Sequence, residues 1–198
     1  MRLFFAINLP QALKTELADV QNEIKNSFPM EISDAVAKWV APENLHITLL
    51  FLGEVGDKEI SFLTRAVGAA LKDAPPLVLR LTKTSYGPAK KNPPQLIWLE
   101  TAKNEILEKL ILDLAEEIFK ANIRCGDRGA AENFFGHITL ARVKEWVWKR
   151  IDPEERPEIE KELDLKIDVR SIELMESRLK RSGPEYAVLQ SFPLAGLD

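Results

Sequence analysis

The chain has 198 residues, of which 45% are hydrophobic and 29% are charged, as is usual for a soluble globular protein. No apolar run is long enough to cross a membrane, and a formal net charge of −4 argues against a protein that binds long nucleic acid through a broad basic surface. The single cysteine, Cys125, rules out an internal disulfide and fits a reducing cytoplasm. We therefore expect a cytoplasmic monomer that forms one domain over residues 1–198.

Hydrophobic periodicity predicts strands and helices that alternate along the chain. Pro10 stands where the first turn of a helix accepts proline, and Asp57 is a suitable N-cap for another helix. The clearest helix carries one apolar stripe from Leu107 to Phe119. In chain order we expect a strand over residues 1–9, a helix over 10–28, a strand over 45–52, a helix over 57–74, strands over 77–85 and 96–100, a helix around 107–119, and strands over 136–143, 167–178 and 185–192, with long loops over 87–95 and 152–164.

Two of the predicted strands carry the same tetrapeptide, His-Ile-Thr-Leu, at residues 46–49 and at residues 137–140. These copies contain the only two histidines of the chain. Because side chains alternate along a strand, the histidine and the threonine of each copy point to the same face. A single histidine or threonine on a strand is more often a packing residue. The repetition, however, favours a functional site built from two matched His/Thr pairs.

The order of elements around the two tetrapeptides also repeats. A strand, a helix and the tetrapeptide strand run from Phe5 to His46, a separation of 41 residues, and again from Trp98 to His137, a separation of 39 residues. Such a repeat suggests two pseudo-symmetric lobes, with motif-bearing segments of about residues 1–55 and 96–145. We expect an α+β fold in which each lobe is an antiparallel sheet with helices on its outer face, and in which the cleft between the lobes is the active site.

Two histidines suit acid–base chemistry at phosphorus. Imidazole has the side-chain pKa closest to neutral pH, so one ring can accept a proton from water while the other donates a proton to a departing alkoxide. The hydroxyls of Thr48 and Thr139 can donate hydrogen bonds to non-bridging phosphate oxygens. This chemistry demands no metal or other cofactor, and two histidines with one cysteine do not resemble a zinc-binding set. The pattern leaves open which of His46 and His137 is the acid.

With these residues in view, the sequence resembles a known family. Two His-x-Thr motifs 91 residues apart are similar to those of the two-histidine phosphoesterase superfamily. The flanking residues resemble its bacterial and archaeal RNA 2′,3′-cyclic phosphodiesterases, historically described as 2′–5′ RNA ligases. The matching segments are residues 1–7, 39–55, 137–142, 174–179 and 186–194.

This resemblance implies a bilobal fold and the metal-independent hydrolysis of a 2′,3′-cyclic phosphate at an RNA or oligonucleotide end to a 2′-phosphate. It also implies that His46 is the proton donor to the leaving 3′ oxygen and that His137 is the proton acceptor that activates water. Thr48 and Thr139 would then hold the phosphate.

Two positions depart from the family pattern: arginine is common at the position of Leu50, and proline at that of Gly136. By alternation, residue 50 would face the site, so a contact to the substrate is expected to be missing. Arg128 and Arg178 are candidates to replace it, and Arg142 ranks below them because strict alternation turns it away from the site. Aromatic residues that could stack on a base, but more often pack in a core, are Phe51, Tyr86, Phe134 and Phe135.

Other readings keep the same residues. The site could act on small cyclic nucleotides or on ADP-ribose cyclic phosphate from tRNA splicing. The reverse reaction would join RNA ends through a 2′–5′ bond, although abundant water favours hydrolysis. The chain could also be an RNA-end binding module without turnover, but two intact motifs and the acidic net charge count against that alternative.

Overall fold

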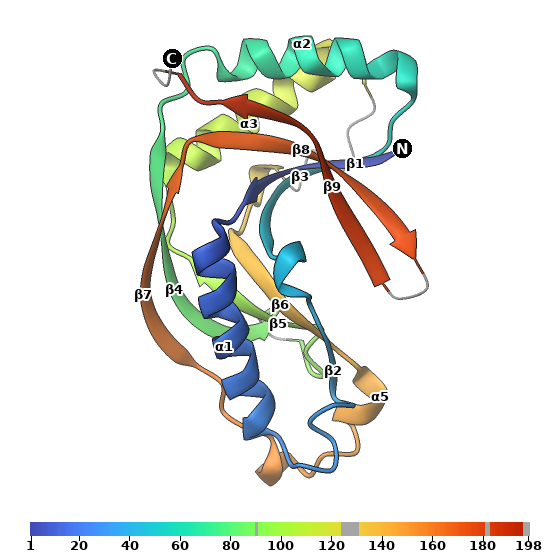
Figure 1. Ribbon diagram of the computed structural model, residues 1–198, viewed down its shortest axis with the longest axis vertical. Coiled ribbons are helices and arrows are strands. Elements are labelled where there is room, and N and C mark those ends of the chain that lie inside the picture. Colours follow the sequence, from blue (N-terminus) through green and yellow to red (C-terminus); the bar gives the residue numbers. More distant parts are fainter. Residues whose placement is uncertain (90, 124–130, 181–182, 196–198) are drawn as a thin grey trace.

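The computed structural model describes residues 1–89, 91–123, 131–180 and 183–195. Within these residues nine strands form one antiparallel sheet in the order β7-β4-β5-β6-β3-β1-β8-β9, with β2 paired to β6 (Figure 1). The fold is therefore α+β, as the sequence predicts. The strands are β1 (Arg2–Asn8), β2 (Ala37–Trp39), β3 (His46–Glu54), β4 (Leu77–Gly87), β5 (Leu96–Thr101), β6 (His137–Val143), β7 (Lys161–Val169), β8 (Ser171–Lys180) and β9 (Gly183–Pro193); the α-helices are α1 (Gln11–Ser27), α2 (Ile60–Leu71), α3 (Glu105–Lys120) and α5 (Glu145–Trp148).

The largest difference from the predicted elements lies near the C-terminus. A single strand was expected over residues 167–178, but β7 and β8 are separate strands on either side of Arg170. They lie in opposite halves of the sheet, because β7 pairs with β4 whereas β8 pairs with β1. Alternation continues through both strands, so periodicity alone could not reveal that the chain changes partners there. The short strand β2 was also not expected, because three residues are too few to show a period.

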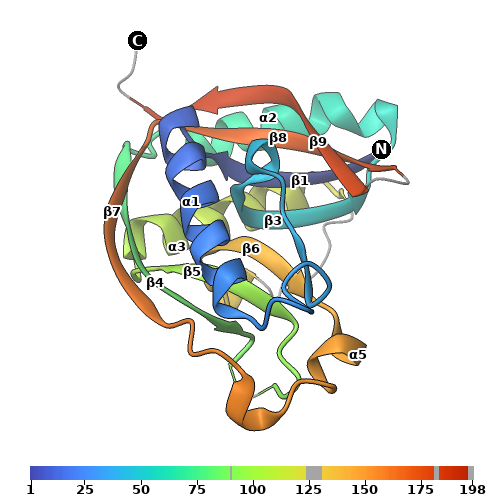
Figure 2. The same cartoon turned by 60° about the horizontal axis from the view of Figure 1, so that its bottom comes forward.

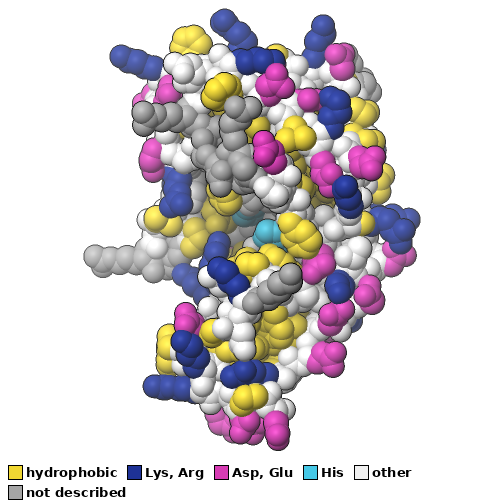
Figure 3. Space-filling model, turned by 180° about the vertical axis from the view of Figure 1, so that it is seen from behind, with side chains coloured by type: hydrophobic (Ala, Val, Ile, Leu, Met, Phe, Trp, Pro, Cys, Tyr) yellow, Lys and Arg dark blue, Asp and Glu magenta, His cyan; other side chains and the backbone are white. Residues whose placement is uncertain are grey.

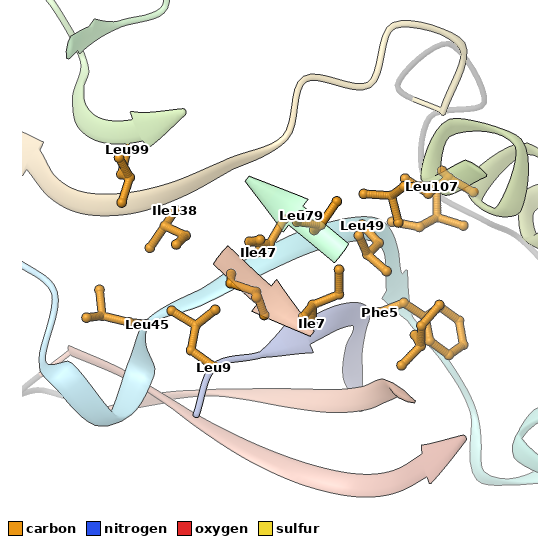
Figure 4. Close-up of a cluster of buried hydrophobic side chains, with 14 of the residues drawn as sticks. Phe5, Ile7, Leu9, Leu45, Ile47, Leu49, Leu79, Leu99, Leu107 and Ile138 are labelled. Carbon is orange, nitrogen blue, oxygen red and sulfur yellow. The ribbon is translucent and has the colours of Figure 1, made fainter. Parts of the chain in front are cut away.

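The two HITL strands lie next to each other in the centre of the sheet. β3 and β6 run antiparallel, and Ile47 pairs with Ile138. Pairing centred on these residues places the histidine of each motif across from the threonine of the other. Both isoleucines are fully buried, and Figure 4 shows them within the main hydrophobic cluster. The histidines and threonines therefore point to the opposite face.

The hydrophobic cluster on the isoleucine side also contains the apolar stripes of α1, α2 and α3. Each fully buried leucine or isoleucine contributes roughly 1.5–3 kcal/mol, so this cluster fixes which face of the sheet remains open. Helix α1 is attached to the centre of the sheet by Gln21, whose Nε2 donates to the backbone oxygens of Val40 and Leu140 at 2.8 Å each. Helix α2 lies along β9, the strand at one edge of the sheet, as Figure 2 shows. None of the described helices is long and apolar enough to span a membrane.

A β-bulge interrupts each HITL strand at the leucine of the motif. In β3 the register skips Leu49, which has no partner on β1, and in β6 it skips Leu140, which has no partner on β5. A bulge shifts the alternation of side chains by one residue. Beyond each motif, the residues that face the open side of the sheet are therefore not those that simple alternation predicts.

Candidate active site

A cleft of about 750 Å³ lies over the junction of β3 and β6. All four polar residues of the two motifs line it: His46, Thr48, His137 and Thr139. Figure 3 shows the histidine side chains inside this hollow, with apolar and basic side chains around it. The fold thus brings together two segments that are 91 residues apart in the sequence.

The first imidazole is held at both of its ring nitrogens. Nδ1 of His46 lies 2.7 Å from the backbone oxygen of Asn44, and Nε2 lies 3.0 Å from Oγ1 of Thr48. A carbonyl oxygen only accepts, so Nδ1 carries the hydrogen and Nε2 of the neutral ring accepts from the Thr48 hydroxyl. The ring packs against Phe4 and Tyr186, with centroids 5.1 and 4.9 Å away. These contacts fix the tautomer and leave Nε2 as the atom that can exchange a proton.

The second imidazole has the same backbone bond but different neighbours. Nδ1 of His137 donates to the backbone oxygen of Phe135 at 2.9 Å. The ring lies against Trp98, with centroids 4.6 Å apart. The indole is itself fixed, because its Nε1 donates to Oγ of Ser85 at 2.7 Å. As in the first half of the site, Nε2 is the ring atom left for chemistry.

Burial lowers the pKa of both imidazoles below the ordinary value, because the cationic form loses hydration. The backbone hydrogen bonds oppose this shift. The charges of Lys14, His137 and Arg142, in that order, lower the pKa of His46 further. Arg142 lowers and Glu100 raises the pKa of His137. Without a bound anion both rings are therefore neutral near pH 7, and the two differ in the charges around them.

The arginine that follows the second motif faces the cleft, contrary to the expectation from strict alternation. The bulge at Leu140 reverses the faces, so Arg142 lines the cleft. The equivalent position after the first motif, five residues beyond the histidine, is Phe51, which is 60% exposed and also lines the cleft. Leu50 is buried and packs in the main hydrophobic cluster, and it is also among the residues that line the cleft. The expectation that Leu50 lacks the substrate contact of an arginine stays a prediction.

The cleft is cationic although the chain is acidic. Its described lining includes Arg2, Lys38 and Arg142 and no carboxylate, in a chain that has 31 acidic and 27 basic residues. A concave surface lined by one sign of charge concentrates ligands of the other sign. Within the described residues, no three His, Cys, Asp or Glu side chains gather as a metal-binding group. The arrangement thus suits an anionic ligand held by protein groups.

Comparison with known proteins identifies the family of this chain. Residues 7–98 match the family model described as LigT like Phosphoesterase. The chain is 32% identical over 201 residues to the RNA 2′,3′-cyclic phosphodiesterase of Thermus thermophilus, covering 99% of this chain and 91% of the relative. The chain belongs to the LigT-like phosphoesterase family. A relative of the same name from Thermotoga maritima is 28% identical over 200 residues, covering 99% of this chain and 97% of the relative.

Solved structures of this family share the fold along the whole chain. A crystal structure of a Thermus thermophilus protein has a TM-score of 0.77 at 28% identity and covers 100% of both chains. E. coli LigT complexed with 3′-AMP has a TM-score of 0.70 at 26% identity and covers 98% of this chain and 97% of that one. The likeness thus includes both HITL strands and the sheet that joins them.

The departure from the family pattern at Gly136 has a local cause. A Cβ at this position would lie 2.1 Å from Oγ1 of Thr101, closer than any real contact. Thr101 approaches because its backbone nitrogen and its Oγ1 both donate to the Gly136 oxygen, at 2.9 and 3.1 Å. Glycine therefore allows β5 to pack directly against the residue that precedes His137.

The two arginines preferred from the sequence receive no support as substrate contacts. Arg178 does not line the cleft, and its guanidinium pairs with Glu176 at 2.7 Å. Its neighbours Ser177 and Leu179 line the cleft instead, because alternation on β8 turns Arg178 away. Arg128 lies outside the described residues.

Of the four aromatic residues considered for base stacking, three line the cleft: Phe51, Phe134 and Phe135. Tyr86 does not. Its hydroxyl donates to the backbone oxygen of Pro157 at 3.0 Å and burial raises its pKa, so it is a packing residue. Sequence reasoning missed the aromatic residues Phe4, Trp98 and Tyr186, since they come from strands that carry no motif. Comparison of the fifth residue after each histidine, Phe51 and Arg142, could have raised the rank that the sequence gave to Arg142.

Proposed function

We propose that this protein hydrolyses 2′,3′-cyclic phosphates at the ends of RNA or oligonucleotides to 2′-phosphates. The observation that carries the proposal is the pair of imidazoles that line one cleft, each with Nδ1 bonded to a backbone carbonyl and Nε2 left for proton transfer. Support also comes from curated relatives named RNA 2′,3′-cyclic phosphodiesterase that align over the whole chain.

The reaction replaces one bond to phosphorus with another. Water attacks the phosphorus and loses a proton to Nε2 of His137, while the bond from phosphorus to the 3′ oxygen breaks. Nε2 of His46 gives its proton to that oxygen, so the product is a 2′-phosphate and a 3′ hydroxyl. Each proton transfer contributes about 10²–10⁴-fold to the rate. The roles of the two rings are those implied by the family resemblance.

Three further side chains would stabilise the charge on the phosphate. Thr48 and Thr139 each lie across the β3–β6 junction from the opposite histidine, where their hydroxyls can donate to the non-bridging oxygens. Arg142, on the same wall, adds a fixed cation. A bound phosphate raises the pKa of both imidazoles, which restores the proton that the acid needs.

The direct experiment is an assay of the purified protein on an oligonucleotide that ends in a 2′,3′-cyclic phosphate, in the presence of EDTA. We expect a 2′-phosphate product, and loss of turnover in His46→Ala and in His137→Ala. Turnover that survives unchanged in either variant would refute the mechanism, and binding without product would support the alternative of a non-catalytic RNA-end binding module.

The assignment of acid and base has a separate test. A substrate whose 3′ oxygen is replaced by sulfur has a leaving group that departs without a proton. We expect this substrate to restore much of the lost rate in His46→Ala and little in His137→Ala. The reverse result would exchange the two roles.

We also propose that the protein works as a cytoplasmic monomer and as one bilobal domain over residues 1–198, with repeats at about residues 1–55 and 96–145. The observation that supports one domain is the single sheet that joins both halves of the chain. Size-exclusion chromatography coupled to light scattering should give a mass near 22.4 kDa, and thermal unfolding should show one transition.

A further inference from the structure

Helix α1 carries a buried lysine next to the first half of the site. The side chain of Lys14 is 6% exposed, and its Nζ donates to Oδ1 of Asn8 at 2.8 Å and to the backbone oxygen of Glu43 at 2.9 Å. Within the described residues, the other buried charged side chain is that of Glu173, whose Oε2 accepts from the backbone nitrogen of Asn8 at 3.1 Å. Both buried charges are therefore bonded to the same residue of β1.

These hydrogen bonds connect Lys14 to the groups that hold the first imidazole. Asn8 is the cross-strand partner of His46. Glu43 belongs to a 3₁₀ turn, and the next backbone oxygen of that turn, on Asn44, accepts from Nδ1 of His46. The bond at Nδ1 determines which ring nitrogen carries the hydrogen. Lys14 thus fixes both the strand opposite the imidazole and the turn whose carbonyl sets its tautomer.

A neutral side chain on the same helix makes the same kind of connection. Gln21 is also 6% exposed, and its Nε2 donates to two backbone oxygens. An amide avoids the loss of hydration that a buried ammonium suffers. Burial lowers the pKa of Lys14 from a value far above neutral pH, and the carboxylate of Glu43 opposes the shift, so the group stays a cation at pH 7. Hydrogen bonding alone therefore does not require a lysine at residue 14.

The charge of Lys14 acts on the imidazole. Burial has the largest effect on the pKa of His46 and lowers it, and Lys14 stands first among the charges that lower it further. The titratable and charged groups around the ring are Lys14 on α1, Glu43 in the 3₁₀ turn, Glu173 on β8, Tyr186 on β9, and His137 and Arg142 on β6. His137 and Arg142 line the cleft, where a bound phosphate offsets their charge, whereas Lys14 does not. Its effect on the ring therefore persists when substrate is bound.

We propose that Lys14 is a positioning residue for His46: it holds the ring in its Nδ1–H tautomer through the turn, and it places a fixed cation beside the ring that favours release of the Nε2 proton. This inference rests on the proposed function, in which that proton goes to the 3′ oxygen as its bond to phosphorus breaks. Lys14 exchanges no proton and touches no substrate. It acts through His46 by making the ring a stronger acid.

The first test is an NMR titration of the two imidazoles without substrate. Because the chain has only two histidines, the variant His46→Ala is enough to assign their signals. We expect Lys14→Met, which keeps a long side chain without the charge, to raise the pKa of His46 and to leave that of His137 unchanged. Nitrogen-15 shifts should also show a fraction of the Nε2–H tautomer at neutral His46 in this variant, and none in the wild type.

Gln21→Met is the matched control, because it removes two hydrogen bonds of an equally buried side chain from the same helix without a change of charge. We expect it to lower the stability of the fold and to leave the pKa of His46 unchanged. If Lys14→Met does not fold, Lys14→Gln repeats the measurement, since it keeps an N–H donor without the charge. An unchanged pKa of His46 in the folded Lys14 variant would overturn the proposal.

The second test separates proton donation from support of the fold. A cyclic phosphate whose 3′ oxygen is replaced by sulfur has a leaving group that needs no proton. At a pH where His46 is protonated, we expect Lys14→Met to lower kcat on the oxygen substrate by about three- to tenfold, because a weaker acid donates more slowly, and to leave kcat on the sulfur substrate unchanged. Gln21→Met should change both by the same factor. An equal loss on both substrates in Lys14→Met would show that Lys14 only supports the fold.

Failure of the proposed function is distinguishable from failure of this inference, because the titration uses no substrate. If the wild type hydrolyses neither substrate, the proposed function is wrong, and a raised pKa of His46 in Lys14→Met still supports the link between the two residues. Turnover by the wild type together with an unchanged pKa of His46 in Lys14→Met would refute the inference and leave the proposed function in place.

Discussion

The two halves of the site share a backbone but not their surroundings. Each histidine donates from Nδ1 to the carbonyl two residues earlier, and each is followed by a bulge at the leucine of its motif. The neighbouring strand presents Asn8 beside His46 but Glu100 beside His137. Five residues after each histidine the first half has an aromatic ring and the second half has a guanidinium.

This difference matters because the proposed reaction is not symmetric. At the same moment one imidazole must be neutral and the other protonated. A repeated strand supplies two equivalent Nε2 atoms, and the charges beside each ring must then make them unequal. Lys14 lowers the pKa of His46, whereas Glu100 raises that of His137. The following experiments test how far the halves are equivalent, from the largest expected effect to the smallest.

Removal of either imidazole is expected to have the largest effect. His46→Ala and His137→Ala should each lower kcat by about 10²–10⁴-fold, and the double variant should lose much less than the product of the two, because the groups act as a unit. Steady-state kinetics on a cyclic-phosphate oligonucleotide would measure this, with circular dichroism to verify folding. A loss of kcat in the double variant that equals the product of the two single losses would show that the two imidazoles act independently.

Substitution of the residue five positions after each histidine by alanine should separate the contribution of charge to catalysis from that of base stacking. We expect Arg142→Ala to lower kcat/KM by about 10–100-fold, since a charged hydrogen-bond donor is worth roughly 1.5–3 kcal/mol. Phe51→Ala should mainly raise KM, by about 5–100-fold, if a base stacks there, since one stacking contact is worth about 1–3 kcal/mol. High salt should weaken substrate binding less in Arg142→Ala than in Phe51→Ala. Equal salt dependence of substrate binding in the two variants would contradict the assignment of charge to Arg142 and of base stacking to Phe51.

The pH dependence of kcat/KM should reveal which half carries which role. Because burial lowers the pKa of both histidines, the bell-shaped profile should lie at acidic pH, with its maximum below about 6.5. Removal of the charge in Lys14→Met raises the pKa of His46. If His46 is the acid, the basic limb of the profile then moves to higher pH.

The complementary variant acts on the other ring. Glu100→Gln removes the charge that raises the pKa of His137, so that pKa falls, and if His137 is the base the acidic limb moves to lower pH. Both variants should therefore broaden the profile. A profile that narrows in both variants would mean that the roles of the two histidines are exchanged. The two limbs give apparent pKa values that belong to the coupled pair of histidines and not to either residue alone.

The smallest expected effect is on stability. Gly136→Ala places a Cβ against Thr101 and should lower the free energy of unfolding by about 1–3 kcal/mol. The equivalent position before the first histidine is Leu45, whose side chain is buried in the core. Adding Thr101→Ala removes the clashing oxygen, so the double variant should be more stable than Gly136→Ala alone. Urea denaturation would measure all three proteins.

The sequence by itself predicted the two matched His/Thr pairs that line the cleft, and it determined the class of fold. Both histidines lie in identical tetrapeptides, and alternation within each tetrapeptide is undisturbed, so the prediction that His46 shares a face with Thr48 needed only local geometry. The strand and helix order around them was also readable, because amphipathic periodicity is a local property.

Only the tertiary structure decided what surrounds the two motifs. The bulges at Leu49 and Leu140 arise from pairing with β1 and β5, and the bulge at Leu140 turned Arg142 into the cleft. Pairing across 104 residues of chain placed Lys38 beside Arg142, and the change of partner at Arg170 split one expected strand into two. Strand register depends on residues distant in the sequence, so no local pattern specifies it.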